Sequence, residues 1–353
     1  MSMDAQLQAR ADSAIEESWQ KRATSQPNTR YALGAMQEVT PEYTRISIET
    51  AERVGRQLAM GLTAAGLSIE SRLQGSVPLN VHVRSVSDVD LLSLQTGFLT
   101  YATIGIRSRQ GYYTSPTAQT SLGVLWNLRT EIEKILKEKF PAATVDISGG
   151  KAVNIAGDSL ARPVDVEPSH WFDSAAYQAS REPHDRGITI LDKKVPATVD
   201  NFPFLHIKRV GDRCDSTLGG LRKSIRLCKN VKADAATEGT DISLPSFDIA
   251  AAMYHADLAA LRLGSVYELR ILAETQRFLD YLACNHEYAK TLVVPDDSRK
   301  IFNTAAKLDG LNRLSIEMDE LAKEVAKEQK PALAIRDISL SESRAAIESL
   351  LIR

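Results

Sequence analysis

The sequence predicts an α+β protein: a mixed sheet with a long packing helix, joined to a C-terminal helical lobe. Within residues 68–167, several short segments alternate apolar and polar residues with a period of two, as in half-buried strands. After about residue 196, apolar residues recur at the three- and four-residue steps of helices. Strands followed by helices are typical of α+β proteins, and small ligands usually bind in clefts. We therefore expect the active site in the cleft between the lobes.

The long packing helix has clear end signals. Thr40 is a suitable N-cap, and Pro41 fits the first helical position. Apolar residues then follow at helical spacing until Gly66, namely Ala51, Val54, Leu58, Leu62 and Ala65.

The other elements are assigned from the same patterns. Strands are expected over residues 68–74, 88–92, 144–147, 152–155 and 162–167, with a helix over 119–139 and a turn at Gly149-Gly150. Later helices are expected over 215–232, 245–263, 266–286 and 297–328, and an early one over about 4–21. These segments predict a helical extension (1–39), a sheet-containing lobe (40–200) and a helical lobe (201–353).

Composition excludes several classes of protein. The 353 residues contain 43 Lys and Arg against 45 Asp and Glu, a net charge of −2, which excludes a globally basic nucleic-acid coat protein. No apolar run approaches the roughly 18 residues of a membrane span, and the polar N-terminus is unlike a secretory signal. Three widely spaced cysteines predict neither a disulfide framework nor a structural zinc. A cytoplasmic protein without membrane contact is expected.

Acidic residues on two predicted strands are the strongest chemical signal. Asp88 and Asp90 share one strand face, with Cα atoms about 6.6 Å apart, and repel each other unless cations neutralise them. If the strand that carries Asp165 is a neighbour, three carboxylates meet, a set suited to two Mg²⁺ ions, or Mn²⁺ as an alternative. Asp-x-Asp is also common in turns, so the pair alone leaves a turn open.

A Gly-Ser pair precedes the acids. Gly75-Ser76, between a strand and an expected helix, presents backbone N–H groups and a hydroxyl to an anion and so predicts a phosphate cradle. His82, between this pair and the acids, is expected in an exposed loop.

A basic segment follows the sheet. Residues 186–232 contain eleven Lys or Arg against four Asp, a net charge of +7. Arg222, Arg226 and Lys229 form a row beside an apolar helical stripe. The spacing leaves open a triphosphate-binding row, a solvated helix face and a nucleic-acid footprint.

Together these residues resemble a known family. Gln74-Gly75-Ser76, Asp88-Val89-Asp90 and Val164-Asp165-Val166 resemble the signature of the polymerase-β-like nucleotidyltransferase superfamily. Residues 219–230 and 244–249 resemble the helical lobe of the oligoadenylate synthase and cyclic GMP-AMP synthase branch. Its bacterial members are cyclic-oligonucleotide synthases of anti-phage defence. The resemblance covers about residues 40–300 and makes 40–200 the nucleotidyltransferase catalytic lobe.

The resemblance implies a role for each matching residue. Asp88, Asp90 and Asp165 would be catalytic and hold Mg²⁺ in a two-metal site. Ser246 would contact phosphates, and Phe247, where Tyr is common, would stack on a base, since stacking needs only the ring. The other implied nucleotide-binding residues are Gln74, Gly75, Ser76, Arg226 and Lys229.

The implied activity is Mg²⁺-dependent joining of NTPs, ATP among them, into a cyclic di- or trinucleotide second messenger, with release of pyrophosphate and a role in anti-phage defence signalling. A linear nucleotidyltransferase acting on RNA or protein, and a catalytically silent nucleotide-binding regulator, remain alternatives. Without a zinc-binding insertion, long duplex DNA is not an expected activator. A regulatory protein partner stays open.

Overall fold

The computed structural model describes residues 25–84, 88–115 and 117–352. Contacts group these residues into two units. The sheet unit comprises residues 40–78 and 88–208, and the helical unit comprises 25–39, 79–84 and 209–352. The helix expected over about 4–21 lies outside the described residues.

The sheet unit is built on one mixed sheet, as the sequence predicts. Strands β1, β2, β5, β4 and β3 are neighbours in that order, and β6 pairs with β5 and β7. The pair β2–β5 is parallel, whereas the other pairs are antiparallel. The strands are β1 Ile69–Gln74, β2 Val89–Tyr101, β3 Thr144–Asp146, β4 Val153–Ala156, β5 Val164–Asp173, β6 Gly187–Asp192 and β7 Ala197–Asn201.

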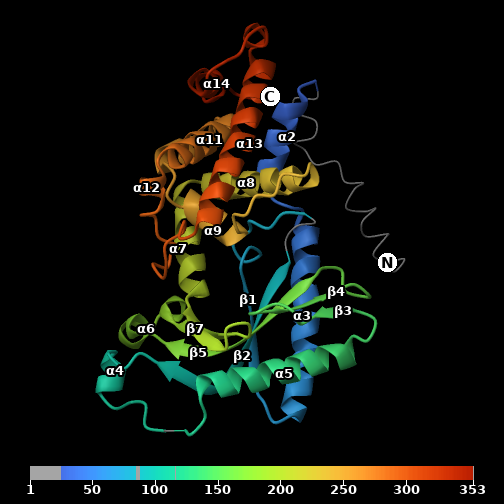
Figure 1. Ribbon diagram of the computed structural model, residues 1–353, viewed down its shortest axis with the longest axis vertical. Coiled ribbons are helices and arrows are strands. Elements are labelled where there is room, and N and C mark those ends of the chain that lie inside the picture. Colours follow the sequence, from blue (N-terminus) through green and yellow to red (C-terminus); the bar gives the residue numbers. More distant parts are fainter. Residues whose placement is uncertain (1–24, 85–87, 116, 353) are drawn as a thin grey trace. The chain divides into compact units, whose positions relative to one another are not determined.

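Two long helices pack on this sheet and enclose the main core. Helix α3 (Pro41–Ala64) starts as predicted, with the Thr40 side chain accepting a hydrogen bond from the Tyr43 amide. Helix α5 (Ser121–Lys139) contacts α3, β5 and β6 (Figure 1). Leu58, Leu62, Leu125 and Ile132 lie in the resulting core. Shorter helices are α4 Ile106–Arg109, α6 Ala175–Ser180 and η2 Pro183–Asp185.

The helical unit contains shorter helices than predicted. Positive φ angles at Leu218 and Gly219 end α7, so the helix expected over 215–232 starts at Gly220. The segment 245–263 is two helices, because Asp257 caps a new one, and the helix expected from 297 starts at Ala305. The helices are α2 Pro27–Met36, α7 Pro203–Ser216 (which begins in the sheet unit), α8 Gly220–Thr237, α9 Ser246–Met253, α10 Leu258–Leu263, α11 Leu269–Cys284, α12 His286–Ala289, α13 Ala305–Gln329, η3 Pro331–Leu333 and α14 Leu340–Ile347.

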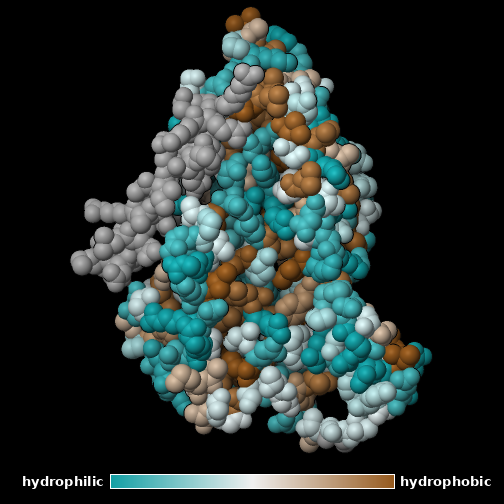
Figure 2. Space-filling view, turned by 180° about the vertical axis from the view of Figure 1, so that it is seen from behind, coloured by the Kyte–Doolittle hydropathy of each residue, from teal (hydrophilic) through white to brown (hydrophobic). Residues whose placement is uncertain are grey.

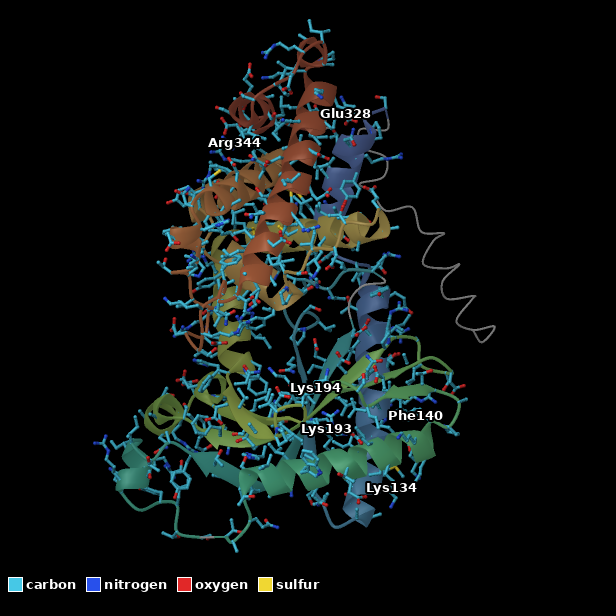
Figure 3. The ribbon with its side chains drawn as sticks, in the orientation of Figure 1. Lys134, Phe140, Lys193, Lys194, Glu328 and Arg344 are labelled. Atoms are coloured by element: carbon cyan, nitrogen blue, oxygen red, sulfur yellow. The ribbon has the colours of Figure 1, made fainter. Side chains whose placement is uncertain are left out.

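Helix α2 is held at both ends. At its start, the Glu328 carboxylate of α13 accepts hydrogen bonds from the amides of Asn28 and Thr29, where a negative charge favours the helix dipole (Figure 3). At its end, Arg226 Nε of α8 donates to the Met36 carbonyl at 2.8 Å, and Asn230 donates to the Ala35 carbonyl. Carbonyls that the helix leaves unpaired are thereby satisfied.

Among the described residues, no helix is long and apolar enough to cross a bilayer. Hydrophilic residues cover most of the face displayed in Figure 2, and apolar residues form groups among them.

Candidate active site

Two of the predicted acids lie side by side. Strands β2 and β5 are parallel neighbours, and Asp90 is the register partner of Asp165. Their strand neighbours Val89, Val164 and Val166 are buried in the core against α3 and α5. Because side chains alternate across a strand, Asp90 and Asp165 belong to the opposite face of the sheet.

Asp88 lies near this pair, and the side-chain amide of Asn154 links it to Asp165. Asn154 Nδ2 of β4 donates to Asp165 Oδ1 at 2.8 Å and reaches Asp88 Oδ2 at 3.4 Å. Burial and the nearby Asp165 charge raise the pKa of Asp88. The three carboxylates therefore form one region of negative charge, which we call the acid cluster.

The Gly75 turn fits closely against the acid cluster. Gly75 has a φ of +73°, and a Cβ atom there would lie 2.0 Å from Asp90 Oδ2. Only glycine combines this backbone conformation with this approach. The helix expected after Ser76 is wrong, because residues 75–80 form turns instead.

A second polar pair extends the same strand face. Gln74 Nε2 donates to Glu167 Oε2 at 2.5 Å, and burial raises the pKa of Glu167. Sequence reasoning missed Asn154 as a candidate site residue. The signal for Asn154 is a polar residue between Val153 and Ile155, which are both buried.

The basic row of the helical unit contacts backbone. Arg226 Nη1 donates to the Asn80 carbonyl at 2.7 Å, and Lys229 Nζ donates to the Val81 carbonyl at 2.9 Å. Both side chains are buried, and burial lowers the pKa of Arg226 to about 10. We call residues 79–84, which supply these carbonyls, the connector. His82 of the connector is 1% exposed, so its expected exposure is wrong.

Ser246 and Phe247 begin α9, and both are exposed. The next residue, Asp248, is buried and pairs with Arg299 at 2.5 Å and with Lys307 at 2.9 Å. The Arg299 guanidinium carbon lies 5.3 Å from the centroid of the Phe247 ring. The ring therefore lies at a helix start that two ion pairs anchor.

Comparison with known proteins identifies the family. Over 314 residues, the chain is 44% identical to the cyclic dinucleotide synthase CdnE of Yersinia aleksiciae, covering 89% of this chain and 81% of that relative. This chain belongs to the CdnE family of cyclic dinucleotide synthases. It is a nucleotidyltransferase, and the ring that the family makes contains two nucleotides.

Further matches agree with this CdnE assignment. A c-di-GMP synthase of Capnocytophaga granulosa is 31% identical over 309 residues, covering 81% of this chain and 84% of the relative. The solved structure of the STING-associated CdnE c-di-GMP synthase from that organism matches with a TM-score of 0.67 and 27% identity, covering 88% of this chain and 92% of that chain. No protein-family model matches the chain.

Enzymes of this family are typically metal-dependent, and the acid cluster offers carboxylate donors for a cation. Across residues 25–84, 88–115 and 117–352, no three His, Cys, Asp or Glu side chains already lie close enough together to hold a metal ion. The donor set nevertheless fits the ion, since carboxylate oxygens are the ligands that Mg²⁺ prefers. The raised pKa of Asp88 also indicates negative charge that a bound cation would neutralise.

Proposed function

We propose that this CdnE-family enzyme joins two nucleoside triphosphates, at least one of them GTP, into a cyclic dinucleotide at the acid cluster. The observation that carries the site is the register pairing of Asp90 with Asp165. The c-di-GMP synthase named among the relatives supports GTP as a substrate.

In each of two successive steps, a ribose hydroxyl oxygen bonds to the α-phosphorus of a triphosphate, the bond from that phosphorus to the pyrophosphate oxygen breaks, and the hydroxyl proton is lost. Asp88, Asp90 and Asp165 would hold two Mg²⁺ ions, or Mn²⁺ in their place. Bound metal would neutralise the phosphates and make the hydroxyl a better nucleophile.

The residues of the chain contribute to the reaction by positioning the nucleotides. Gly75 lies against Asp90, and the backbone N–H groups of the Gly75-Ser76 turn and the Ser76 hydroxyl would hold the triphosphate of the donor nucleotide. Gln74 supports this turn through its bond to Glu167. Ser246 binds phosphate, and the exposed Phe247 ring stacks on a base.

The product is a signal in anti-phage defence. The name of the solved relative, a STING-associated synthase, supports a receptor for the cyclic dinucleotide as the downstream protein. A regulatory protein partner would then set when synthesis begins.

The test of this function is the double variant Asp90→Asn with Asp165→Asn. Purified protein is incubated with labelled NTPs and Mg²⁺, and phosphatase-resistant product is identified by mass. We expect the variant to fold and to lose at least about 1,000-fold in rate, because carboxamides cannot neutralise the metal ions. Asp158→Asn, on an exposed loop of the same unit, is the matched control and should keep wild-type activity.

Product formation by the double variant at more than a tenth of the wild-type rate would contradict the acid cluster as the catalytic site. A wild-type product without guanine would contradict the proposed substrate.

A further inference from the structure

We propose that a cavity inside the helical unit binds a small zwitterion, such as a free amino acid. The carboxylate of the ligand would lie toward Arg270, and its ammonium group toward a rim that carries Asp257 and Glu348. Every residue that lines the cavity belongs to the helical unit. This inference goes beyond the nucleotide chemistry of the acid cluster and does not depend on it.

Three helices form the walls of the cavity. Residues at positions i, i+3, i+4 and i+7 share one face of a helix, and on α11 the lining residues at these positions are Arg270, Ala273, Glu274 and Arg277. Helix α14 lies beside α11 in Figure 1, and both α14 and α10 contact α11. The cavity volume is about 370 Å³, in the lower part of the roughly 300–1,000 Å³ of small-molecule sites. Its size therefore suits a small ligand.

Arg270 brings a positive charge that no neighbour balances. Its Nε atom is buried, yet it donates to no residue in the described part of the chain. Its guanidinium also forms no ion pair across residues 25–84, 88–115 and 117–352. An unpaired buried donor is costly, and a carboxylate binds a guanidinium through short, charge-assisted hydrogen bonds. Arg270 therefore favours an anionic group inside the cavity.

The other two arginines of the cavity already have acidic partners. Arg277 donates to both carboxylate oxygens of Glu274, at 2.6 and 2.7 Å. Arg344, which extends from α14 and is labelled in Figure 3, lies 3.5 Å from a carboxylate oxygen of Asp280. Arg270 is thus the lining arginine that a ligand can neutralise.

The rim of the cavity carries the opposite charge. Asp257 is exposed, and its Oδ1 accepts a hydrogen bond from the Ala260 amide at the start of α10. Glu348, at the end of α14, is partly exposed. Neither carboxylate forms an ion pair with a residue that the structure describes. Because Arg270 Nε is buried, the charge changes sign from the interior of the cavity to its rim.

A zwitterion matches this change of sign. The carbons between its two charges would lie along Ala273 and Leu263, which also line the cavity. A simple anion would satisfy Arg270 alone, and a simple cation would satisfy the rim alone. A nucleotide would bring two or more negative charges to the rim acids and be repelled. The ligand class that fits both ends is therefore the amino acids.

The experiment measures binding to purified wild-type protein by titration calorimetry. The probes are glycine, 4-aminobutyrate and 6-aminohexanoate, which hold a carboxylate and an ammonium group at increasing separation. Acetate and propylamine, at matched ionic strength, each carry one of the two charges. We expect at least one zwitterion to bind at least about 10-fold more tightly than either single-charge probe.

Variants assign the two ends of the ligand. Arg270→Met should weaken zwitterion binding at least about 10-fold, because the charge-assisted hydrogen bonds are lost. Glu348→Gln should weaken it at least about 3-fold and leave acetate binding unchanged. Arg262→Met is the matched control, since Arg262 is an exposed arginine of α10 that does not line the cavity, and it should bind as wild-type protein does.

A second measurement separates binding from a structural role. Without ligand, the Tm of Arg270→Met should equal or exceed that of wild-type protein, because the substitution removes no hydrogen bond and no ion pair. A lower Tm in the ligand-free variant would show that Arg270 stabilises the fold and would contradict the proposed role.

Three further results would overturn the inference. The first is no binding of any of the three zwitterions. The second is acetate binding as tight as zwitterion binding, which is the behaviour of a simple anion site. The third is wild-type zwitterion affinity in Glu348→Gln and in either Arg270→Met or, if that variant does not fold, Arg270→Gln. The experiment uses no nucleotide, so its failure is distinguishable from a failure of the proposed function.

Discussion

The chain contains two clusters of like charge that differ in how their charges are balanced. In the acid cluster, Asp88 and Asp165 share the neutral Asn154 amide, and neither forms an ion pair with any residue that the structure describes. In the basic row of α8, Arg226 and Lys229 are buried, and each donates to backbone carbonyls. Asp88 and Asp165 are thus held by a neutral donor, whereas the cations of the basic row are held by carbonyls of their own chain.

This difference predicts opposite responses to the loss of a charge. Removing a carboxylate from the acid cluster relieves repulsion. Removing a buried cation that holds carbonyls leaves those carbonyls without partners. Substitutions in the acid cluster should therefore lower activity without lowering stability. Substitution of a buried cation should lower both.

Among the single substitutions compared here, Gly75→Ala gives the largest expected effect. The added Cβ would lie 2.0 Å from Asp90 Oδ2, so the carboxylate must move by about 1 Å or more. A displacement of this size lowers kcat by on the order of 100-fold. Product formation under saturating NTP and Mg²⁺ measures the loss.

Gly66→Ala is the control for backbone strain. Gly66 has a φ of +78°, close to that of Gly75, but nothing lies within 4 Å of its added Cβ. It should lose about 1 kcal/mol of stability and keep wild-type kcat. Equal activity losses in the two variants would mean that backbone strain, and not the contact with Asp90, causes the loss in Gly75→Ala.

Arg129→Met tests a buried cation inside the sheet unit. The Arg129 guanidinium donates to the carbonyls of Gly149 and Gly150, and it pairs with Glu133 at 2.8 Å. Lys193, labelled in Figure 3, pairs with the same carboxylate. We expect the free energy of unfolding in urea to fall by about 3 kcal/mol, because carbonyls and a carboxylate lose their donor.

Arg56→Met, on the exposed face of α3, should cost less than about 0.5 kcal/mol, because its ion pair with Glu52 is solvated. Similar losses of stability in Arg129→Met and Arg56→Met would contradict the larger contribution expected of the buried cation.

Asp88→Asn should change stability less than Arg129→Met does, and in the opposite direction. In EDTA at pH 7, the free energy of unfolding should rise by up to about 1 kcal/mol, since a repelled, half-exposed carboxylate is removed. The pKa of Asp88 is raised in the folded state, so wild-type protein should gain stability as pH falls through that pKa and lose it as pH rises.

The asparagine variant should lack this pH-dependent component, and Mg²⁺ with GTP should stabilise it less than wild-type protein. A loss of stability in EDTA would show that the acid cluster is balanced within the chain after all.

Local patterns predicted much of the fold. Thr40, Pro41 and Gly66 mark the ends of one helix through short-range capping and backbone preferences, which the sequence displays directly. The alternation around Asp88 and Asp90 predicted a shared strand face, and it left open whether the strand of Asp165 is a neighbour. It left β6 and β7 unassigned, and it could not foresee that Leu218 and Gly219 would divide a basic helical pattern.

Local sequence patterns could not predict which residues surround the basic row. Helical spacing places Arg226 and Lys229 beside an apolar stripe, but what covers them is a connector more than 140 residues away. His82 of the same connector is also buried, although its neighbours in sequence suggest an exposed loop. Contacts between remote segments carry no periodic signal, so only the folded chain reveals them.

The capping of α2 by Glu328 has a consequence for the order in which the protein is made. Helix α2 emerges early from the ribosome, yet the carboxylate that satisfies its first amides is synthesised 300 residues later. The sheet unit can close once residue 208 has emerged, because its strands and packing helices are then all present. The helical unit must wait for almost the whole polypeptide, so nascent chains pass through a stage in which strands are folded while the first helix still lacks its partner.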